Sequence, residues 1–200
     1  MKTIATFLFT VLISSSAFNT QNGSLSDDER TKAIDYLKNT ESELYEAIKG
    51  LTSEQLNYKS SEENWSIAEC VEHIAISEKL IFGIVESALQ ATPAKKENPA
   101  MTDEQIMGFI VDRTNKVKTR PEFEPKKSFG SYQATLKEYK KLRKEHISFI
   151  KRTKEDLRGH YYEFPFGMTD TYQVVLFMSG HSMRHVNQIK EIKAQADFPS

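Results

Sequence analysis

Two histidines near the carboxyl end of the chain, His181 and His185, lie four residues apart within a stretch whose apolar spacing predicts a helix. On a helix, residues i and i+4 are neighbours on one face, so both imidazoles can reach a single atom. This His-x-x-x-His spacing is a common way for one helix to supply two metal ligands. His73, on an earlier predicted helix, is the best candidate for a third ligand. Three protein ligands would leave one coordination position of the metal open.

The type of ligand limits which metals the site could bind and what chemistry they would supply. Neutral imidazole binds zinc readily and also suits nickel, copper and iron. A water in the open position of such a site has its pKa lowered to about 7, which supplies a nucleophile at neutral pH. The open position could instead polarise a carbonyl group or bind a thiolate. The residues alone also allow a plain helical bundle in which the three histidines are polar members of the core.

The only cysteine, Cys70, precedes His73 by about one helical turn and could be a fourth ligand. A fourth protein ligand would close the site and make it structural. Cys70 and Trp65 also occupy the two positions of a hydrophobic staple, which explains the cysteine without a metal. A single cysteine excludes an intramolecular disulfide.

Three more side chains are candidates for the surroundings of the site. Arg184 could hold an anionic substrate group through a bidentate contact, or form a salt bridge with a neighbouring helix. Gln188, one turn after His185, could hydrogen-bond near the site or link two helices. His146 lies on the apolar face of another predicted helix and is expected in the core, with the wall of a pocket as the alternative. We identify no general acid or base from the sequence.

The helices that must position these residues are marked by their ends. Capping-box patterns at Ser26 and Ser66 predict helices that end near Gly50 and Pro93. The later elements follow from apolar spacing and prolines: a short helix from Thr102 towards Pro121, an extended crossover over 121–129, and helices over 132–157 and from Thr169 or Asp170 to 194.

The segment between the last two helices, 158–167, is predicted as an aromatic-rich loop. Its rings could form a pocket wall or a satellite core; they belong to Tyr161, Tyr162, Phe164 and Phe166. The sequence has no useful length of alternating polar and apolar residues, so strands are not expected. The prediction is an all-α four-helix bundle with one short extra helix in the crossover.

The amino end has the pattern of a secretory signal peptide, with Lys2, an apolar stretch over 3–13 and small residues up to Ala17. It is too short to be a permanent membrane anchor. We expect cleavage after Ala17, a polar leader over 18–25, one domain over 26–200, and a secreted or periplasmic protein. A frayed hydrophobic helix is the alternative. The formal net charge of −1 gives no reason to expect a nucleic-acid partner.

Two segments resemble the signatures of the DinB-like superfamily. Trp-Ser-Ile-Ala-Glu-Cys-Val-Glu-His-Ile, over 65–74, is similar to that family's Trp-Ser-x-x-Glu-x-x-x-His motif. His-Ser-Met-Arg-His-Val-Asn-Gln-Ile, over 181–189, is similar to its His-x-x-Arg-His-x-x-Gln-Ile motif. The resemblance implies an up-down-down-up bundle in which His73, His181 and His185 bind a divalent metal, zinc or nickel.

The resemblance also implies a range of functions. Characterised members of the family include thiol-dependent transferases and isomerases, and others are described as metal-dependent hydrolases. An exported protein would not meet the cytosolic thiol pool, which puts thiol transfer in question. We expect an exported metal-dependent hydrolase or transferase that acts on a small molecule and could form a homodimer. The alternative is a non-catalytic, stress-related module in which the metal stabilises the bundle or captures a ligand.

Overall fold

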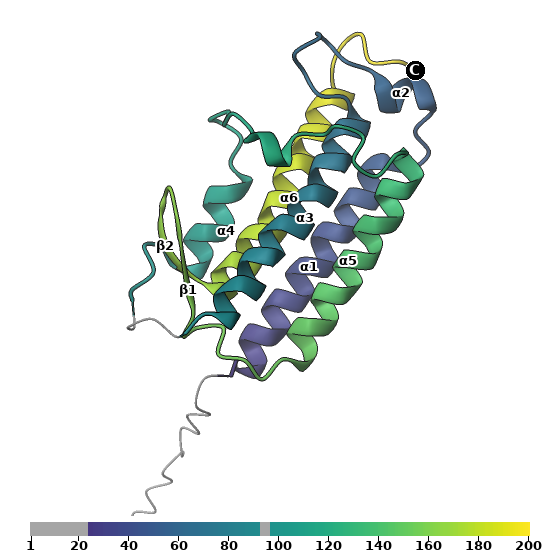
Figure 1. The fold of residues 1–200 in the computed structure, drawn as a ribbon. Helices are drawn as coiled ribbons and strands as arrows, with labels where there is room; N and C mark the ends of the chain where they lie inside the picture. Colours follow the sequence, from purple (N-terminus) through teal and green to yellow (C-terminus); the bar gives the residue numbers. More distant parts are fainter. Residues whose placement is uncertain (1–23, 93–96) are drawn as a thin grey trace, which may run out of the picture.

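Four long helices lie side by side in the computed structural model, which describes residues 24–92 and 97–200 (Figure 1). They are α1 (Asp27–Ile48), α3 (Ile67–Gln90), α5 (Tyr132–Arg152) and α6 (Thr171–Lys193). α1 and α6 run in one direction and α3 and α5 in the other. The predicted all-α bundle with up-down-down-up order is confirmed. The predicted signal peptide and residues 18–23 of the leader lie outside the described residues.

α1, α3 and α6 begin at caps that the sequence predicts. The Ser26 hydroxyl accepts a hydrogen bond from the Glu29 amide at 3.2 Å, and the Glu29 carboxylate accepts one from the Ser26 amide at 2.9 Å. α3 begins with the same reciprocal pair at Ser66 and Glu69. Asp170 caps α6 by accepting from the amide of Gln173 at 2.8 Å. Each cap satisfies amides that lack a partner within the helix, which typically stabilises it by about 1 kcal/mol.

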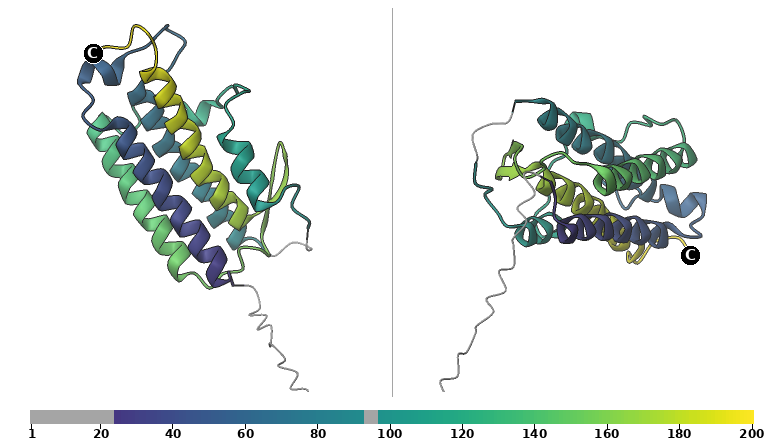
Figure 2. Two further views of the ribbon diagram at one scale, coloured as in Figure 1. Left: turned by 180° about the vertical axis from the view of Figure 1, so that it is seen from behind. Right: turned by 90° about the horizontal axis from the view of Figure 1, so that it is seen from below.

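Shorter elements connect the long helices at their ends. α2 (Ser53–Asn57) follows α1, and α4 (Asp103–Val111) and the 3₁₀ turn η1 (Pro121–Phe123) lie between α3 and α5. α4 packs against the side of α6 that faces away from α5 (Figure 2). It ends before Val117, which we expected within it and which is 80% exposed. No helix in the described part of the chain combines the length and apolar character needed to cross a membrane.

The segment predicted as a loop between α5 and α6 contains a β-hairpin, so that prediction was wrong. β1 (Tyr161–Phe164) pairs antiparallel with β2 (Gly167–Asp170), with Tyr161 opposite Asp170. Strands of four residues are too short for alternation to reveal them in the sequence. α5 also ends at Arg152, five residues earlier than expected. The hairpin aromatics pack onto α6, with the rings of Phe164 and Phe177 4.8 Å apart, as the satellite-core alternative predicts.

A buried polar layer separates two apolar clusters of the bundle core. At its centre, Arg143 donates to Glu78 at 2.8 Å and to Ser182 at 2.9 Å, and its side chain is fully buried. It also donates to the carbonyl oxygen of Leu37 in α1 at 2.8 Å, so one guanidinium on α5 contacts the other three long helices. His146 bonds to the same Glu78 carboxylate at 2.9 Å. Because an unpaired buried charge is costly, this layer favours one alignment of the helices.

Candidate metal centre

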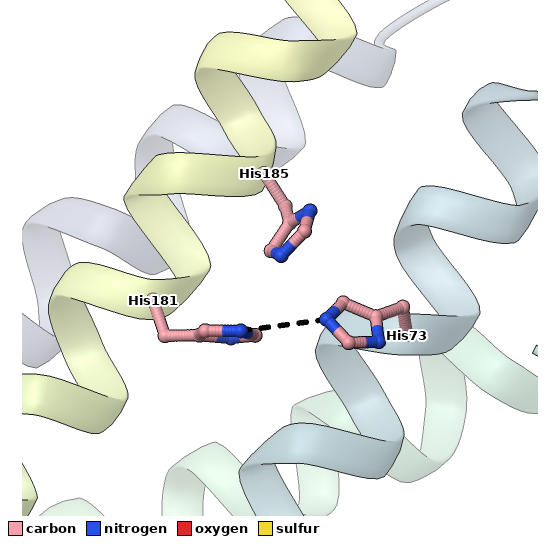
Figure 3. A group of neighbouring side chains, drawn as sticks. All are labelled: His73, His181 and His185. Atoms are coloured by element: carbon pink, nitrogen blue, oxygen red, sulfur yellow. Dashed lines mark hydrogen bonds between the residues drawn. The ribbon is translucent and has the colours of Figure 1, made fainter. Parts of the chain in front are cut away.

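Three imidazoles from two helices converge between α3 and α6. His73 lies on α3, and His181 and His185 lie one turn apart on α6 (Figure 3). One nitrogen from each ring lies within 4.8 Å of the corresponding nitrogens of the other two. The Nε2 atoms of His73 and His181 are 3.4 Å apart. The predicted meeting of His73 with the pair on α6 is therefore present in the fold.

Hydrogen bonds at Nδ1 orient two of the rings. His73 Nδ1 lies 2.7 Å from the carbonyl oxygen of Phe123 in η1. A carbonyl can only accept, so His73 Nδ1 carries the proton and Nε2 presents a lone pair. His185 Nδ1 lies 2.9 Å from Oε1 of Gln188, which has the same consequence. Such acceptors are the usual means by which proteins fix the tautomer of a metal-binding histidine.

Burial keeps all three rings neutral. It lowers the pKa of His73 to about 4, against a weaker opposing effect of the bond to Phe123. Burial and then the neighbouring imidazoles lower the pKa of His181 and of His185 well below the usual value. Neutral imidazole is the form that binds metals. The centre is thus a set of bases ready to bind at neutral pH.

The donor set fits a divalent cation. In a tetrahedral zinc site, nitrogens at about 2.0–2.1 Å from the metal lie about 3.4 Å from one another, and the His73–His181 separation of 3.4 Å agrees with this. The Nδ1 atom of His181 is buried and has no hydrogen-bond partner among the described residues, so no bond at Nδ1 holds Nε2 of this ring away from a metal. Three imidazole nitrogens suit zinc, nickel, copper or iron better than calcium or magnesium, which prefer oxygen.

Aromatic side chains form the walls of the centre. The Trp65 ring centroid lies 4.7 Å from that of His73 and 6.0 Å from that of His185. The Phe177 ring centroid lies 6.2 Å from that of His181. Sequence reasoning gave Trp65 only the role of a staple. Its place directly before the cap of the helix that carries His73 is the signal that it also contacts the site.

A polar pocket of about 310 Å³ opens beside the centre, between the end of α6 and two neighbouring loops. Of the three histidines, His185 lines it, together with polar and aromatic residues that include Trp65, Arg113, Lys116, Arg184 and Gln188. Arg113 is held by two bonds of 2.7 and 2.8 Å to Glu191. A small polar molecule could therefore approach the centre from the His185 side.

Cys70 and His146, the other candidates for the site, lie elsewhere in the core. Cys70 is fully buried among apolar residues and does not belong to the histidine group. Burial raises the pKa of its thiol to about 12, so the thiolate that a metal requires is strongly disfavoured. His146 stacks on Phe82 with ring centroids 3.8 Å apart, within the buried polar layer. This is the core position that the sequence favours for it.

Arg184 and Gln188 have defined but different roles. Arg184 donates to the carbonyl oxygens of Ile110, Asp112 and Asn115, the last at 2.7 Å. It thus binds the carboxyl end of α4 and the following loop, where a cation is favoured by the helix dipole, rather than a carboxylate. These backbone bonds stand in place of the salt bridge that was the second expectation for Arg184. Its contact with an anionic substrate group stays a prediction, since Arg184 lines the pocket. Gln188 contacts His185 and accepts from Arg113 at 3.4 Å, so it does act beside the centre.

Comparisons with known proteins agree with this arrangement. The family model described as DinB superfamily matches residues 36–189. The uncharacterised protein YuaE from Bacillus subtilis (strain 168) is 28% identical over 156 residues, which are 78% of this chain and 93% of YuaE. Among solved structures, YfiT from Bacillus subtilis matches with a TM-score of 0.59 and 17% identity, over 85% of this chain and 89% of its own. YfiT is described as a probable metal-dependent hydrolase with an unusual four-helix bundle topology.

Proposed function

This chain belongs to the DinB superfamily, and we propose that it is a metal-dependent enzyme of the hydrolase or transferase type that acts on a small molecule. The observation that carries the proposal is the convergence of three neutral imidazoles, His73, His181 and His185, between two helices. The description of YfiT supports hydrolysis as the reaction that we favour.

Different residues of the chain would bind the metal, orient its ligands and admit the substrate. Zinc or nickel bound by the three histidines would act as a Lewis acid on a substrate group. Phe123 and Gln188 hold two ligand rings with their lone pairs directed at the metal position. Trp65 shields one side from water, and the polar pocket beside His185 provides an approach for the substrate. Because the ligands come from rigid helices, the geometry is set before the substrate arrives.

Removing one ligand tests the proposal. We expect His181→Ala to lose its equivalent of bound metal and its activity while remaining helical by circular dichroism. His160→Gln is the matched control, because His160 bonds to the carbonyl of Ala88 and lies outside the cluster; it should keep the metal. Metal content is measured by elemental analysis, and activity by a hydrolase substrate screen with and without chelator. A full equivalent of metal in His181→Ala would refute the ligand assignment.

A non-catalytic metal-binding module is the second candidate, because two of the three ligand residues are almost inaccessible. His73 is 3% exposed and His185 is 7% exposed. In this case the wild-type protein would bind one equivalent of metal, and chelation would lower its stability without abolishing any activity found in the screen. Chelator-sensitive turnover that the same metal restores would exclude this candidate.

We also propose that the protein is exported and that its signal peptide is removed after Ala17. The basic, apolar and small residues of the amino end support this proposal. Sequencing the amino terminus of protein recovered outside the cytoplasm should give Phe18 as the first residue. An intact Met1 would refute the proposal, and it would leave the metal centre untouched.

A further inference from the structure

Glu72, the residue before His73, is a buried carboxylate bound to the crossover segment (residues 121–129). It is 7% exposed. Its Oε1 accepts hydrogen bonds from the amides of Ser128 at 2.6 Å and of Lys126 at 3.2 Å. Ion pairs in the described part of the chain do not include Glu72, so these amides are what balances the cost of burying it. A carboxylate on α3 thus holds a loop that is more than fifty residues away in sequence.

The residue between these two amides has an unfavourable backbone conformation. Lys127 has φ of 60°, and it is the one non-glycine residue with positive φ among those the structure describes. The left-handed region is unfavourable for an L-residue, and such a conformation persists when the surrounding structure holds it. The amides of Lys126 and Ser128 both donate to one oxygen of Glu72, so the carboxylate holds the backbone on both sides of Lys127.

The same crossover carries the carbonyl that orients a metal ligand. Phe123 lies three residues before Lys126, and its oxygen accepts from Nδ1 of His73 at 2.7 Å. Glu72 and His73 are adjacent on α3, so the helix bonds to the crossover at two nearby points: the Phe123 carbonyl and the amides around Lys127. Pro125 lies between the two points, and its fixed φ limits how far one can move without the other.

We propose that Glu72 is a positioning residue of the metal centre. It holds the crossover so that the Phe123 carbonyl stays within hydrogen-bond distance of His73, which keeps the His73 lone pair directed at the metal. Glu69, the acidic residue that precedes Glu72 on α3, is occupied by the capping box and by Lys59 at 3.0 Å. The inference rests on the proposed function, because it assumes that His73 binds a metal.

Four variants test the role of Glu72. Glu72→Ala removes the acceptor, and Glu72→Asp keeps the charge but withdraws it from the loop amides. Glu72→Gln retains an oxygen acceptor of the same reach. Glu86→Ala is the matched control, because Glu86 is exposed on the same helix. The first readout is the zinc affinity of the metal-free protein, by competition with a chromophoric chelator. The second is tryptic cleavage after Lys126 and Lys127, by mass spectrometry.

We expect Glu72→Ala and Glu72→Asp to weaken zinc binding about tenfold, the lower end of the effect of losing an outer hydrogen-bond partner of a ligand. Both should also speed cleavage after Lys126 and Lys127. Glu72→Gln should stay close to wild type, and Glu86→Ala should match it. If Glu72→Ala does not fold, Glu72→Asp decides the question, since it keeps a polar group at the buried position.

Two results would overturn the inference. In the first, the crossover is cleaved faster but zinc affinity is unchanged, so that the loop does not position His73. In the second, cleavage is unchanged, so that Glu72 does not hold the loop. Failure of the proposed function looks different, because the wild-type protein would then bind no zinc at all.

Discussion

The three imidazoles differ in how firmly the protein holds them. His73 and His185 each donate from Nδ1 to an oxygen, whereas Nδ1 of His181 is buried and has no partner in the part of the chain that the structure describes. His181 is also the most exposed of the three, although still half-buried. The ring of His181 therefore has the least support from its neighbours, and a bound metal would restrict it more than the other two.

Trp65 provides a direct report of metal binding. It is the only tryptophan in the chain, and its ring lies 4.7 Å from that of His73. A divalent charge placed among the histidines should change the emission of the indole, because fluorescence responds to nearby charge and to the packing of the ring. We expect a titration with zinc to change the emission until one equivalent is bound. The same titration of His73→Ala should give no saturable change, and an unchanged signal in wild-type protein that binds zinc would contradict the geometry.

Cys70 should behave as a core residue and not as a ligand. Its thiol is fully buried, and burial raises its pKa from the ordinary 9.0 to about 12. The folded thiol therefore stays protonated at pH 8, where an unfolded cysteine is partly ionised and reactive. We expect a disulfide reagent at pH 8 to modify Cys70 only in denaturant, and Cys70→Ala to keep one equivalent of zinc. Rapid modification of the native protein, or loss of zinc in the variant, would contradict this prediction.

At the level of elements, the sequence predicts best where a local pattern decides the structure. The capping boxes at Ser26 and Ser66 involve residues three positions apart, so they can be recognised without knowing the fold. The hairpin around Gly167 depends on contacts of its aromatic rings with α6, and its strands are too short to show their period. α4 and α5 end earlier than predicted, because apolar spacing alone does not distinguish the last turn of a helix from the loop that follows it.

The residues of the candidate site also differ in whether a local sequence pattern reveals them. The pair His181 and His185 is local, and His73 follows from a motif on one helix. The partners Phe123 and Glu72 depend on where the crossover passes over α3, and a backbone carbonyl leaves no trace in the residue type. Gln188 could be anticipated because it lies one turn from His185. The contacts that the backbone of the crossover makes with His73 and Glu72 could not be anticipated from the sequence.

Gly180 lets α4 approach α6 closely. A Cβ at this position would lie 2.3 Å from Cγ2 of Ile110 and 2.9 Å from the Tyr36 hydroxyl. Gly180→Ala should therefore lower the free energy of unfolding by about 1–3 kcal/mol, the usual cost of overpacking. Gly83 in α3 is the matched control, because a Cβ there would meet nothing within 4 Å. Gly83→Ala should raise stability by about 0.5–1 kcal/mol through helix propensity alone. Denaturant unfolding measures both, and equal effects would show that α4 is not closely packed.

At the scale of the whole molecule, the buried polar layer and the metal centre act at successive levels of the bundle. Arg143 contacts Ser182, which directly follows His181 and precedes His185 by three residues on α6. The layer therefore limits the rotation of α6 about its axis, and with it the direction in which His181 and His185 point. A metal would join α3 to α6, whose ligand residues are separated by a long stretch of chain that includes α4 and α5. Such a link should stabilise the entire bundle rather than one element.

The stability of the bundle should consequently depend on metal concentration. A ligand that binds only the folded state raises the free energy of unfolding by about 2.7 kcal/mol at a hundredfold excess over Kd. For a domain of this size, that corresponds to a rise in Tm of roughly 5–10 °C. We expect thermal unfolding to show such a rise when zinc is added to metal-free wild-type protein, and its loss on chelation. His73→Ala should show no rise, whereas His160→Gln should respond like wild type. An equal response in His73→Ala would mean that zinc stabilises the protein at another site, and that α3 and α6 are not joined by it.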